Sequence, residues 1–514
     1  MADSDSDRDG EGGQPMPPAE PAEPPEQPSC LVPELLCEYL KIPKSPTEVT
    51  LMLKVRAVAQ ATEDRRAPIT ICAVIDRSGS MKKHLPLLKE TLQFMVQQLR
   101  SSDKLGVVTF DHEVKTELPL TAMTTSGKLL AERAIDGVKE RGHTNLSGGL
   151  LAALEALYRI PENEASQVES VLLFTDGKAN VGIKAQAPLV KATSSMLDQI
   201  GRQANVFTFG YGGEHDADLL RAVSEAGHGL FYYIDNADSI PESFCDCLGG
   251  LLSVSAQNVR LLFRAAERMK LHKPLTTYST TEMEQHTEYQ VTIPDIYCEE
   301  EKCILVKVTT PGRDSMSESE NLALSSCTVT YFDVLNSCPV QHRVECSVVL
   351  NPAISCPVTS DCVDDVEQHR LRCEVAEALG KANKMADSGN FAGARGLLQG
   401  TVKRVRGSRV SRQVLAVHLL ETLQESLEGI QDKVTFAQHG KAVILSYAGS
   451  HWQQRSNTKP SQEGYVRRRT EMAPTGLLSA KSAASSAPSS TNSYSPYRNS
   501  HKTTLLSHYA ATKK

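Results

Sequence analysis

The alternation of short apolar segments with helix-like segments across residues 70–240 most constrains what this chain can fold into. Residues 69–75 form a nearly continuous apolar run, which is typical of a strand buried on both faces of a sheet. Residues 87–99 follow with apolar side chains at helical spacing. This order predicts an α/β fold, Rossmann-like, with a mostly parallel sheet and helices on both faces. Further strand-like runs lie at 105–110, 168–174 and 206–210.

A second pattern follows, in which strand-like segments are not separated by helical ones. It predicts an antiparallel β-sandwich. Residues 49–57 precede the α/β domain and alternate in the same way, so we expect them to add a strand to this sandwich and the α/β domain to be inserted in it or flanked by it. The strand-like segments are 257–263, 289–293, 303–310, 326–332 and 343–350.

Apolar residues at helical spacing across 363–430 predict an α-helical region, and both chain ends have the composition of disordered segments. We therefore expect six parts along the chain. They are an acidic, proline-rich and mostly disordered head (1–45), strands of the sandwich (46–67), the α/β domain (68–245), the sandwich (246–355), the helical region (360–450) and a basic, serine-rich disordered tail (451–514).

The formal net charge of −7 is spread unevenly over the 514 residues. Residues 1–29 carry −7 and residues 451–514 carry +8, so the body between them is acidic and a nucleic-acid partner is not expected. The amino terminus lacks the apolar segment of a signal peptide, and no apolar stretch is long enough to span a membrane. With an odd count of 13 cysteines, we expect reduced thiols and a cytoplasmic or nuclear location.

Oxygen-bearing side chains follow two of the predicted strands and precede a helix. Asp76, Ser78 and Ser80 follow the first buried strand, Thr144 lies in a loop before a helix, and Asp176 follows the third buried strand. Each motif alone could be an ordinary turn, but open α/β sheets bind ligands beyond the carboxyl ends of their strands. Two carboxylates and three hydroxyls form a hard, oxygen-only set that suits Mg²⁺ or Mn²⁺ better than Ca²⁺. We therefore predict a metal site.

These motifs carry a resemblance to a known family. The α/β domain resembles a von Willebrand factor type A (VWFA, vWA) domain, and the five predicted ligands match the metal-ion-dependent adhesion site (MIDAS) of that family. The resemblance implies that Ser78, Ser80 and Thr144 coordinate the metal directly. It implies that Asp76 and Asp176 act directly or through water.

The resemblance extends over about residues 46–456, to intracellular plant proteins that combine a type A domain with a RING finger. A RING finger needs paired Cys-x-x-Cys ligands, and this chain contains no Cys-x-x-Cys. Ubiquitin-ligase activity of the chain itself is therefore not implied. The segments that carry this wider resemblance are 66–69, 210–216, 245–254 and 295–302, with 440–446 and 451–455 resembling the end of the relatives' helical region, often called Vwaint.

Two other groups are interpreted as structural, and a further residue, Arg77, is not expected to bind the metal. Cys245 and Cys247 are expected to pack within a helix, because a single Cys-x-Cys supplies too few metal ligands. His215 and Asp216 are expected to lie in a loop that caps the next helix. Arg77 stands where many relatives carry a small or apolar residue, so we expect it to affect ligand preference without binding the metal.

We therefore expect a non-catalytic intracellular adaptor whose bound metal, Mg²⁺ or Mn²⁺, receives an Asp or Glu side chain of a partner protein. No catalytic residue is predicted. One alternative is an accessory or substrate-recruiting component of a ubiquitin-ligase pathway, with the RING finger on another chain. Extracellular adhesion and metal-dependent hydrolysis are the other open alternatives.

Overall fold

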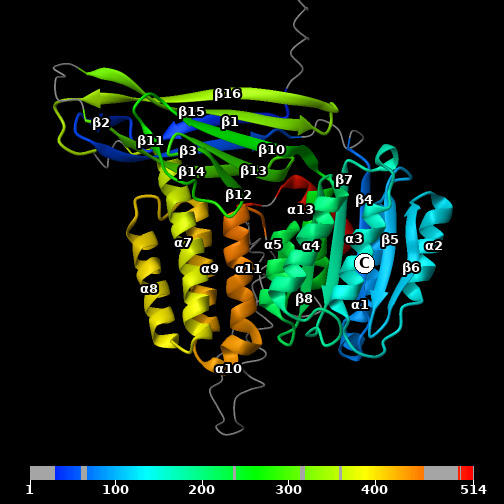
Figure 1. The fold of residues 1–514 in the computed structure, drawn as a ribbon. Helices are drawn as coiled ribbons and strands as arrows, with labels where there is room; N and C mark the ends of the chain where they lie inside the picture. Colours follow the sequence, from blue (N-terminus) through cyan, green and yellow to red (C-terminus); the bar gives the residue numbers. More distant parts are fainter. Residues whose placement is uncertain are drawn as a thin grey trace, which may run out of the picture.

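The computed structural model describes residues 29–59, 66–235, 239–312, 319–357, 362–456, 496–497 and 499–512. Figure 1 shows a β-sandwich lying across one end of two other units, an α/β domain and a helical region, which stand side by side. The fold class predicted from the sequence is confirmed: a mostly parallel sheet with helices on both faces, antiparallel sheets, and a helical region after them.

The α/β domain is built on one six-stranded sheet with the order β6-β5-β4-β7-β8-β9, in which only the edge strand β6 is antiparallel. Helices α1, α2 and α6 cover one face, and α3, α4 and α5 cover the other. The strands are β4 (Ile69–Asp76), β5 (Lys104–Phe110), β6 (Val114–Ala122), β7 (Val168–Thr175), β8 (Ala204–Tyr211) and β9 (His228–Ile234). The helices are η2 (Gly79–Lys83), α1 (Leu85–Gln98), α2 (Thr125–Asp136), α3 (Leu146–Tyr158), η3 (Glu162–Glu164), α4 (Gln186–Ile200), α5 (Ala217–Ala226) and α6 (Ile240–Leu251).

The sandwich consists of a four-stranded sheet, β1-β3-β14-β11, and a six-stranded sheet, β12-β13-β10-β15-β16-β2. Strand β3 precedes the α/β domain and pairs antiparallel with β14, which follows it, so the α/β domain is an insertion in the sandwich. The strands are β1 (Leu31–Cys37), β2 (Lys41–Pro43), β3 (Thr47–Ala57), β10 (Val254–Ala265), β11 (Lys270–Leu271), β12 (Ser279–Glu284), β13 (Glu288–Tyr297), β14 (Glu301–Thr310), β15 (Glu320–Asp333) and β16 (Cys338–Asn351).

The helical region shares one apolar core with the face of the α/β domain that carries α3, α4 and α5. Its last helix, α11, packs against α5 and β9. In the part of the chain that the structure describes, no helix has the length and apolar character needed to cross a membrane. The helices of this region are α7 (Asp364–Asp387), α8 (Phe391–Gly407), α9 (Val414–Gly429), α10 (Lys433–Thr435), the π-helix η6 (Phe436–Gly440) and α11 (Lys441–Gln453). A separate helix, α13 (Ser500–Thr512), lies near the carboxyl end.

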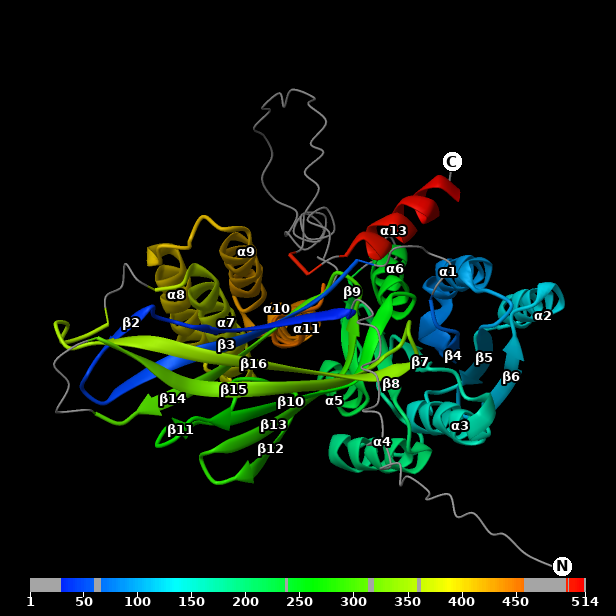
Figure 2. The same cartoon turned by 90° about the horizontal axis from the view of Figure 1, so that it is seen from above.

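The boundaries of the predicted disordered head and tail are wrong in two places. Strands β1 and β2 lie within residues 1–45, and β1 pairs with β3 along its whole length. Beyond residue 450, all residues up to Ser456 are buried except the half-buried Trp452. Helix α13 lies beside α6 (Figure 2), and its Leu505 and Tyr509 pack into the core that α6 and α1 share. In both places the segment is held by contacts with another part of the fold. Residues 1–28 of the predicted head and residues 457–495, 498 and 513–514 of the predicted tail lie outside the described residues.

Candidate metal site

The predicted ligands meet at the point where the strand order of the α/β sheet changes direction. From β4 the chain crosses to β5 on one side, whereas β7 lies on the other side and leads on to β8. Open α/β sheets form their ligand crevice at such a switch point, beyond the carboxyl ends of the strands. Asp76 is the last residue of β4, and Asp176 directly follows β7. The two carboxylates therefore stand at the ends of the two strands that meet at this switch point.

Hydrogen bonds connect the first and third ligand loops. The Asp76 carboxylate accepts from the Ser78 amide (2.8 Å) and from the Thr175 hydroxyl (2.5 Å). The Ser80 hydroxyl donates to Asp176 (2.6 Å) and lies 3.1 Å from the Ser78 hydroxyl. Four of the five predicted ligands thus form one continuous network of oxygen atoms.

Thr144 reaches the same place from the loop before α3. A methyl group at Gly177 would lie 3.5 Å from the Thr144 hydroxyl and 3.7 Å from the Ser80 hydroxyl, so both hydroxyls face this glycine. The Asn180 side chain accepts from the Thr144 amide (2.8 Å), and the Asn180 amide donates to the Thr144 carbonyl (3.0 Å). The structure therefore brings all five predicted side chains together.

Burial disfavours the ionised form of both carboxylates when no cation is nearby. Burial raises the pKa of Asp76 to about 6, the nearby Asp176 adds to the rise, and hydrogen bonds from Thr175 and Ser78 oppose it. Burial also raises the pKa of Asp176. Ser80 is exposed, whereas the other four side chains are buried. The donor set fits a hard divalent cation, since all five groups offer oxygen and two of them carry charge.

Thr175 and Asn180 are contributors that sequence reasoning missed. Thr175 stands beside Asp176 in the motif Phe174-Thr-Asp-Gly, so its place at the strand end was a usable signal. No sequence pattern pointed to Asn180, because it contacts Thr144, which lies 36 positions away in the sequence. Both hold ligand loops in position through hydrogen bonds.

Arg77 points away from the ligands into a buried ion-pair cluster. Its Nε lies 2.9 Å from the Asp111 carboxylate, which also accepts from Arg141 (2.8 Å). The backbone of the cluster is joined to the ligand loops, since the Asn145 amide donates to the Asp111 carbonyl (2.7 Å). Arg77 therefore stabilises the loops around the site through Asp111.

The other groups interpreted as structural have structural contacts. Asp216 caps α5 by accepting from the Leu219 amide (3.0 Å), and Cys245 and Cys247 are buried in α6. His215 packs under the same loop, where burial lowers its pKa to about 4. Its ring lies against Gly210, at which a methyl group would come within 2.6 Å of Nε2.

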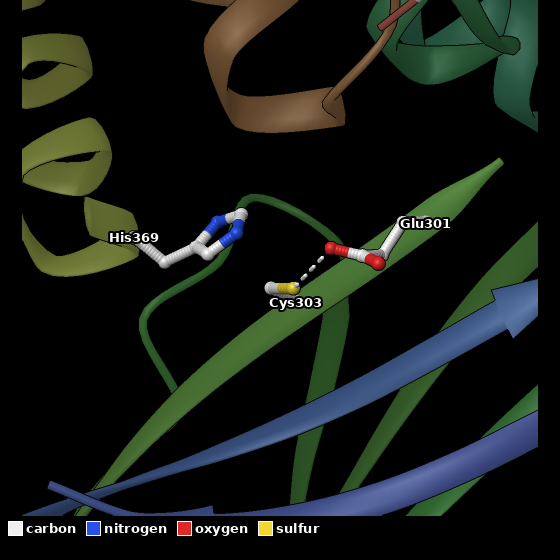
Figure 3. Close-up of side chains that lie close together, drawn as sticks. All are labelled: Glu301, Cys303 and His369. Atoms are coloured by element: carbon white, nitrogen blue, oxygen red, sulfur yellow. Dashed lines mark hydrogen bonds between the residues drawn. The ribbon is translucent and has the colours of Figure 1, made fainter. Parts of the chain in front are cut away.

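A second group of possible metal ligands lies far from this edge, at the junction of β14 and α7. Figure 3 shows Glu301, Cys303 and His369 facing one another, with the Cys303 thiol 3.6 Å from Glu301. Two cations already occupy their surroundings: the Lys54 ammonium lies 3.3 Å from Glu301, and Arg372 donates to Nδ1 of His369 (3.1 Å). These contacts satisfy the cluster without a metal, and we interpret it as structural.

Comparison with known proteins identifies the α/β domain. Residues 70–245 match the model of the von Willebrand factor type A domain, so the chain contains a VWA domain. Two relatives are plant E3 ubiquitin-protein ligases of Arabidopsis thaliana. WAV3 is 29% identical over 48% of this chain and 32% of its own length, and WAVH1 is 23% identical over 72% of this chain and 48% of its own length.

The uncharacterized protein sll0103 of Synechocystis is 26% identical over 50% of this chain and 61% of its own length. The chain thus spans less than two thirds of the length of each of these relatives. Among solved structures, a von Willebrand factor type A protein from Catenulispora acidiphila superposes with a TM-score of 0.61 at 14% identity, covering 84% of this chain and 99% of its own. At that identity the likeness shows the fold alone.

Proposed function

We propose that this protein is a non-catalytic interaction adaptor that binds an acidic side chain of a partner protein through Mg²⁺ held by the predicted ligands. VWA domains commonly mediate protein–protein interactions and typically bind a divalent metal. The observation that carries the proposal is the convergence of five oxygen side chains at the switch point of the sheet. The ligands are Asp76, Ser78, Ser80, Thr144 and Asp176.

The charge of the ligand set favours an acidic partner. Two aspartates balance the charge of a divalent ion, and the three hydroxyls add none, so the ion keeps its affinity for a further anionic oxygen. Mg²⁺ prefers six oxygen ligands and keeps open positions for exchangeable ones. Only Ser80 among the five is exposed, so a partner's carboxylate would approach on that side.

The surroundings support binding rather than catalysis. Arg77 and Asp111, the charged pair behind the ligand loops, are held in mutual ion pairs. We place the adaptor in the cytoplasm or nucleus. In support, the thirteen cysteines are free thiols in the described structure, which suits a reducing compartment.

The test is calorimetric titration of Mg²⁺ into the full chain, comparing wild type with Asp76→Ala. The control is Asp198→Ala, which makes the same substitution at an exposed position on α4 of the same domain. We expect Asp76→Ala alone to abolish the binding heat, while the circular dichroism spectrum of the variant stays that of the wild type and so shows an unchanged fold. Equal heats for wild type and Asp76→Ala would refute the metal site.

A second candidate function is an accessory role in a ubiquitin-ligase pathway. The similarity to WAVH1 favours it, because that alignment covers 72% of this chain and so reaches beyond the VWA domain. Proximity labelling in cells with wild type and Asp76→Ala would test it. Enrichment of ubiquitin-conjugating enzymes or RING proteins by wild type alone is the expected result, and labelling that never includes them would contradict it.

A further inference from the structure

A cavity of about 640 Å³ lies between the VWA domain and the helical region, next to the metal site. One wall comes from the loop after β7, which contributes Lys178, and from residues 213–218 after β8. The other wall comes from residues 386–391 and 433–442, at the turn between α7 and α8 and at the start of α11. Lys178 is only two residues beyond the predicted ligand Asp176. The loop after β7 therefore contributes to both the metal site and the cavity, and Glu214, between lining residues Gly213 and His215, is close enough to Asp176 to raise its pKa.

The two walls are held together by tight contacts. A methyl group at Gly213 would come within 1.9 Å of the Gln438 carbonyl, so the two backbones touch directly. The Tyr233 hydroxyl at the end of β9 lies 3.0 Å from Nδ1 of His439. Gln438 and His439 belong to the π-helix η6, a form that frequently occurs at functional sites. Because the walls are fixed, a ligand would not have to order them on binding.

Some of the charged side chains that line the cavity form ion pairs, and others do not. Lys441 forms ion pairs with both Asp218 and Asp387, and Asp216 caps α5. Lys178 and Lys433 are exposed, and neither takes part in an ion pair with any other residue that the structure describes. The cavity thus offers two available ammonium groups, while each of its aspartates already has a partner.

Two aromatic side chains also line the cavity. The rings of Phe391 and Phe436 pack edge to face, with centroids 5.8 Å apart, and both line the cavity. Ala437 also lines the cavity, and it is exposed. Cavities with an apolar lining and a few placed polar groups, set between domains, are typical ligand sites.

We propose that this cavity is a second subsite for the same partner segment, so that the protein recognises two acidic residues joined by a short stretch with an apolar side chain. The first carboxylate coordinates the metal, and the apolar side chain packs against Phe391 and Phe436. The second carboxylate forms ion pairs with Lys178 and Lys433. This inference rests on the proposed function, and it adds the chemistry of the recognised segment.

The experiment selects peptides from a displayed library of random twelve-residue sequences on the immobilised full chain in Mg²⁺, with elution by EDTA. Eluted peptides are resynthesised and their affinities measured. We expect two acidic positions in the enriched sequences. We expect Lys178→Glu combined with Lys433→Glu to weaken their binding about ten-fold, since two favourable exposed charge pairs with the second acid become repulsive. Replacing the second acid of the peptide by lysine should restore binding to this double variant.

Two control variants distinguish the effect of charge in the cavity from the effect of its shape. Lys191→Glu on α4 makes the same reversal at an exposed position outside the cavity and should leave affinity unchanged. Ala437→Trp should weaken binding by filling the cavity. EDTA-eluted peptides with a single acidic position, bound equally by wild type and the double variant, would overturn the second subsite and leave the metal site intact. A selection that yields no EDTA-sensitive peptide would refute the proposed function itself.

Discussion

Replacing Arg455 with methionine should destabilise the junction of the sandwich, the helical region and the VWA domain. Arg455 follows α11, is 3% exposed, and its guanidinium donates to the carboxylates of Asp295 and Glu300. It also stacks on Tyr297, 3.9 Å from the ring centre. Burial opposes ionisation of Glu300, but Arg455 and Lys302 outweigh it and lower the pKa of Glu300 to about 2.

The size of the effect follows from what the substitution leaves behind. Removing one partner of a buried ion pair typically costs about 3–5 kcal/mol, because the other charge stays buried without compensation. Here Glu300 keeps its hydrogen bond from Lys302 (2.7 Å), and Asp295 keeps its hydrogen bond from the side-chain amide of Asn205 (2.5 Å). We therefore expect a loss near the lower end, about 3 kcal/mol, with methionine filling part of the space of the arginine stem.

The assay is urea unfolding followed by tryptophan fluorescence. The chain has one tryptophan, Trp452, which packs beside Met52, Cys303 and Leu305 of the sandwich and therefore reports on this junction. The matched control is Arg343→Met, which removes an exposed pair with Glu345 on the same sandwich and should cost less than about 1 kcal/mol.

Asp295→Asn combined with Arg455→Met should lose less than the sum of the two single losses, since removing both charges leaves neither uncompensated. A loss below about 1 kcal/mol for Arg455→Met alone, equal to that of the control, would refute the reasoning.

Three further predictions concern other contacts. His215 has a folded pKa of about 4 against an ordinary value of 6.5. Its contribution to stability is therefore complete above pH 6.5 and is lost as the pH falls toward 4; this amounts to about 3 kcal/mol, and a His215→Gln variant should show a flatter pH dependence in urea unfolding. Gly213→Ala should push the VWA domain off Gln438 and speed proteolysis of the helical region, whereas unchanged cleavage would contradict the contact. Tyr509→Ala should lower stability by about 3 kcal/mol by removing the ring that packs edge to face on Phe94, and thermal unfolding equal to wild type would contradict docking of α13.

The central strands and the ligand loops could be predicted because short-range patterns determine them. Strands β4 and β7 are buried along their whole length, so their sequences read as continuous apolar runs. The carboxyl ends of such runs lie at one edge of a parallel sheet. Asp76 and Asp176 stand at these ends, so the sequence predicts that they lie at the same edge. Strand β6 was missed, because it is an edge strand with mostly exposed residues and an internal proline, Pro119.

The chain ends could not be predicted, because their structure depends on what they pack against. Strand β1 contains Pro33 and Glu34, and it is tolerated as a strand because it lies at the edge of its sheet. Helix α13 is rich in serine, threonine and histidine, and a helix of 13 residues is marginal in isolation. Its Lys502 lies against Gly249 and near Asp246 of α6, a contact between residues more than 250 positions apart.

The insertion of the VWA domain explains why distant parts of the chain matter for its site. Both ends of the domain enter the sandwich, through β3 before it and β10 after it, so the sandwich determines which side of the VWA domain the helical region can reach. Arg455 and the buried Lys302 attach the end of α11 to that sandwich. The helical wall of the cavity and the VWA domain are therefore both attached to the sandwich. A substitution at Arg455 should accordingly weaken recognition of a two-acid segment while leaving Mg²⁺ affinity unchanged, because the five metal ligands all lie within the inserted domain.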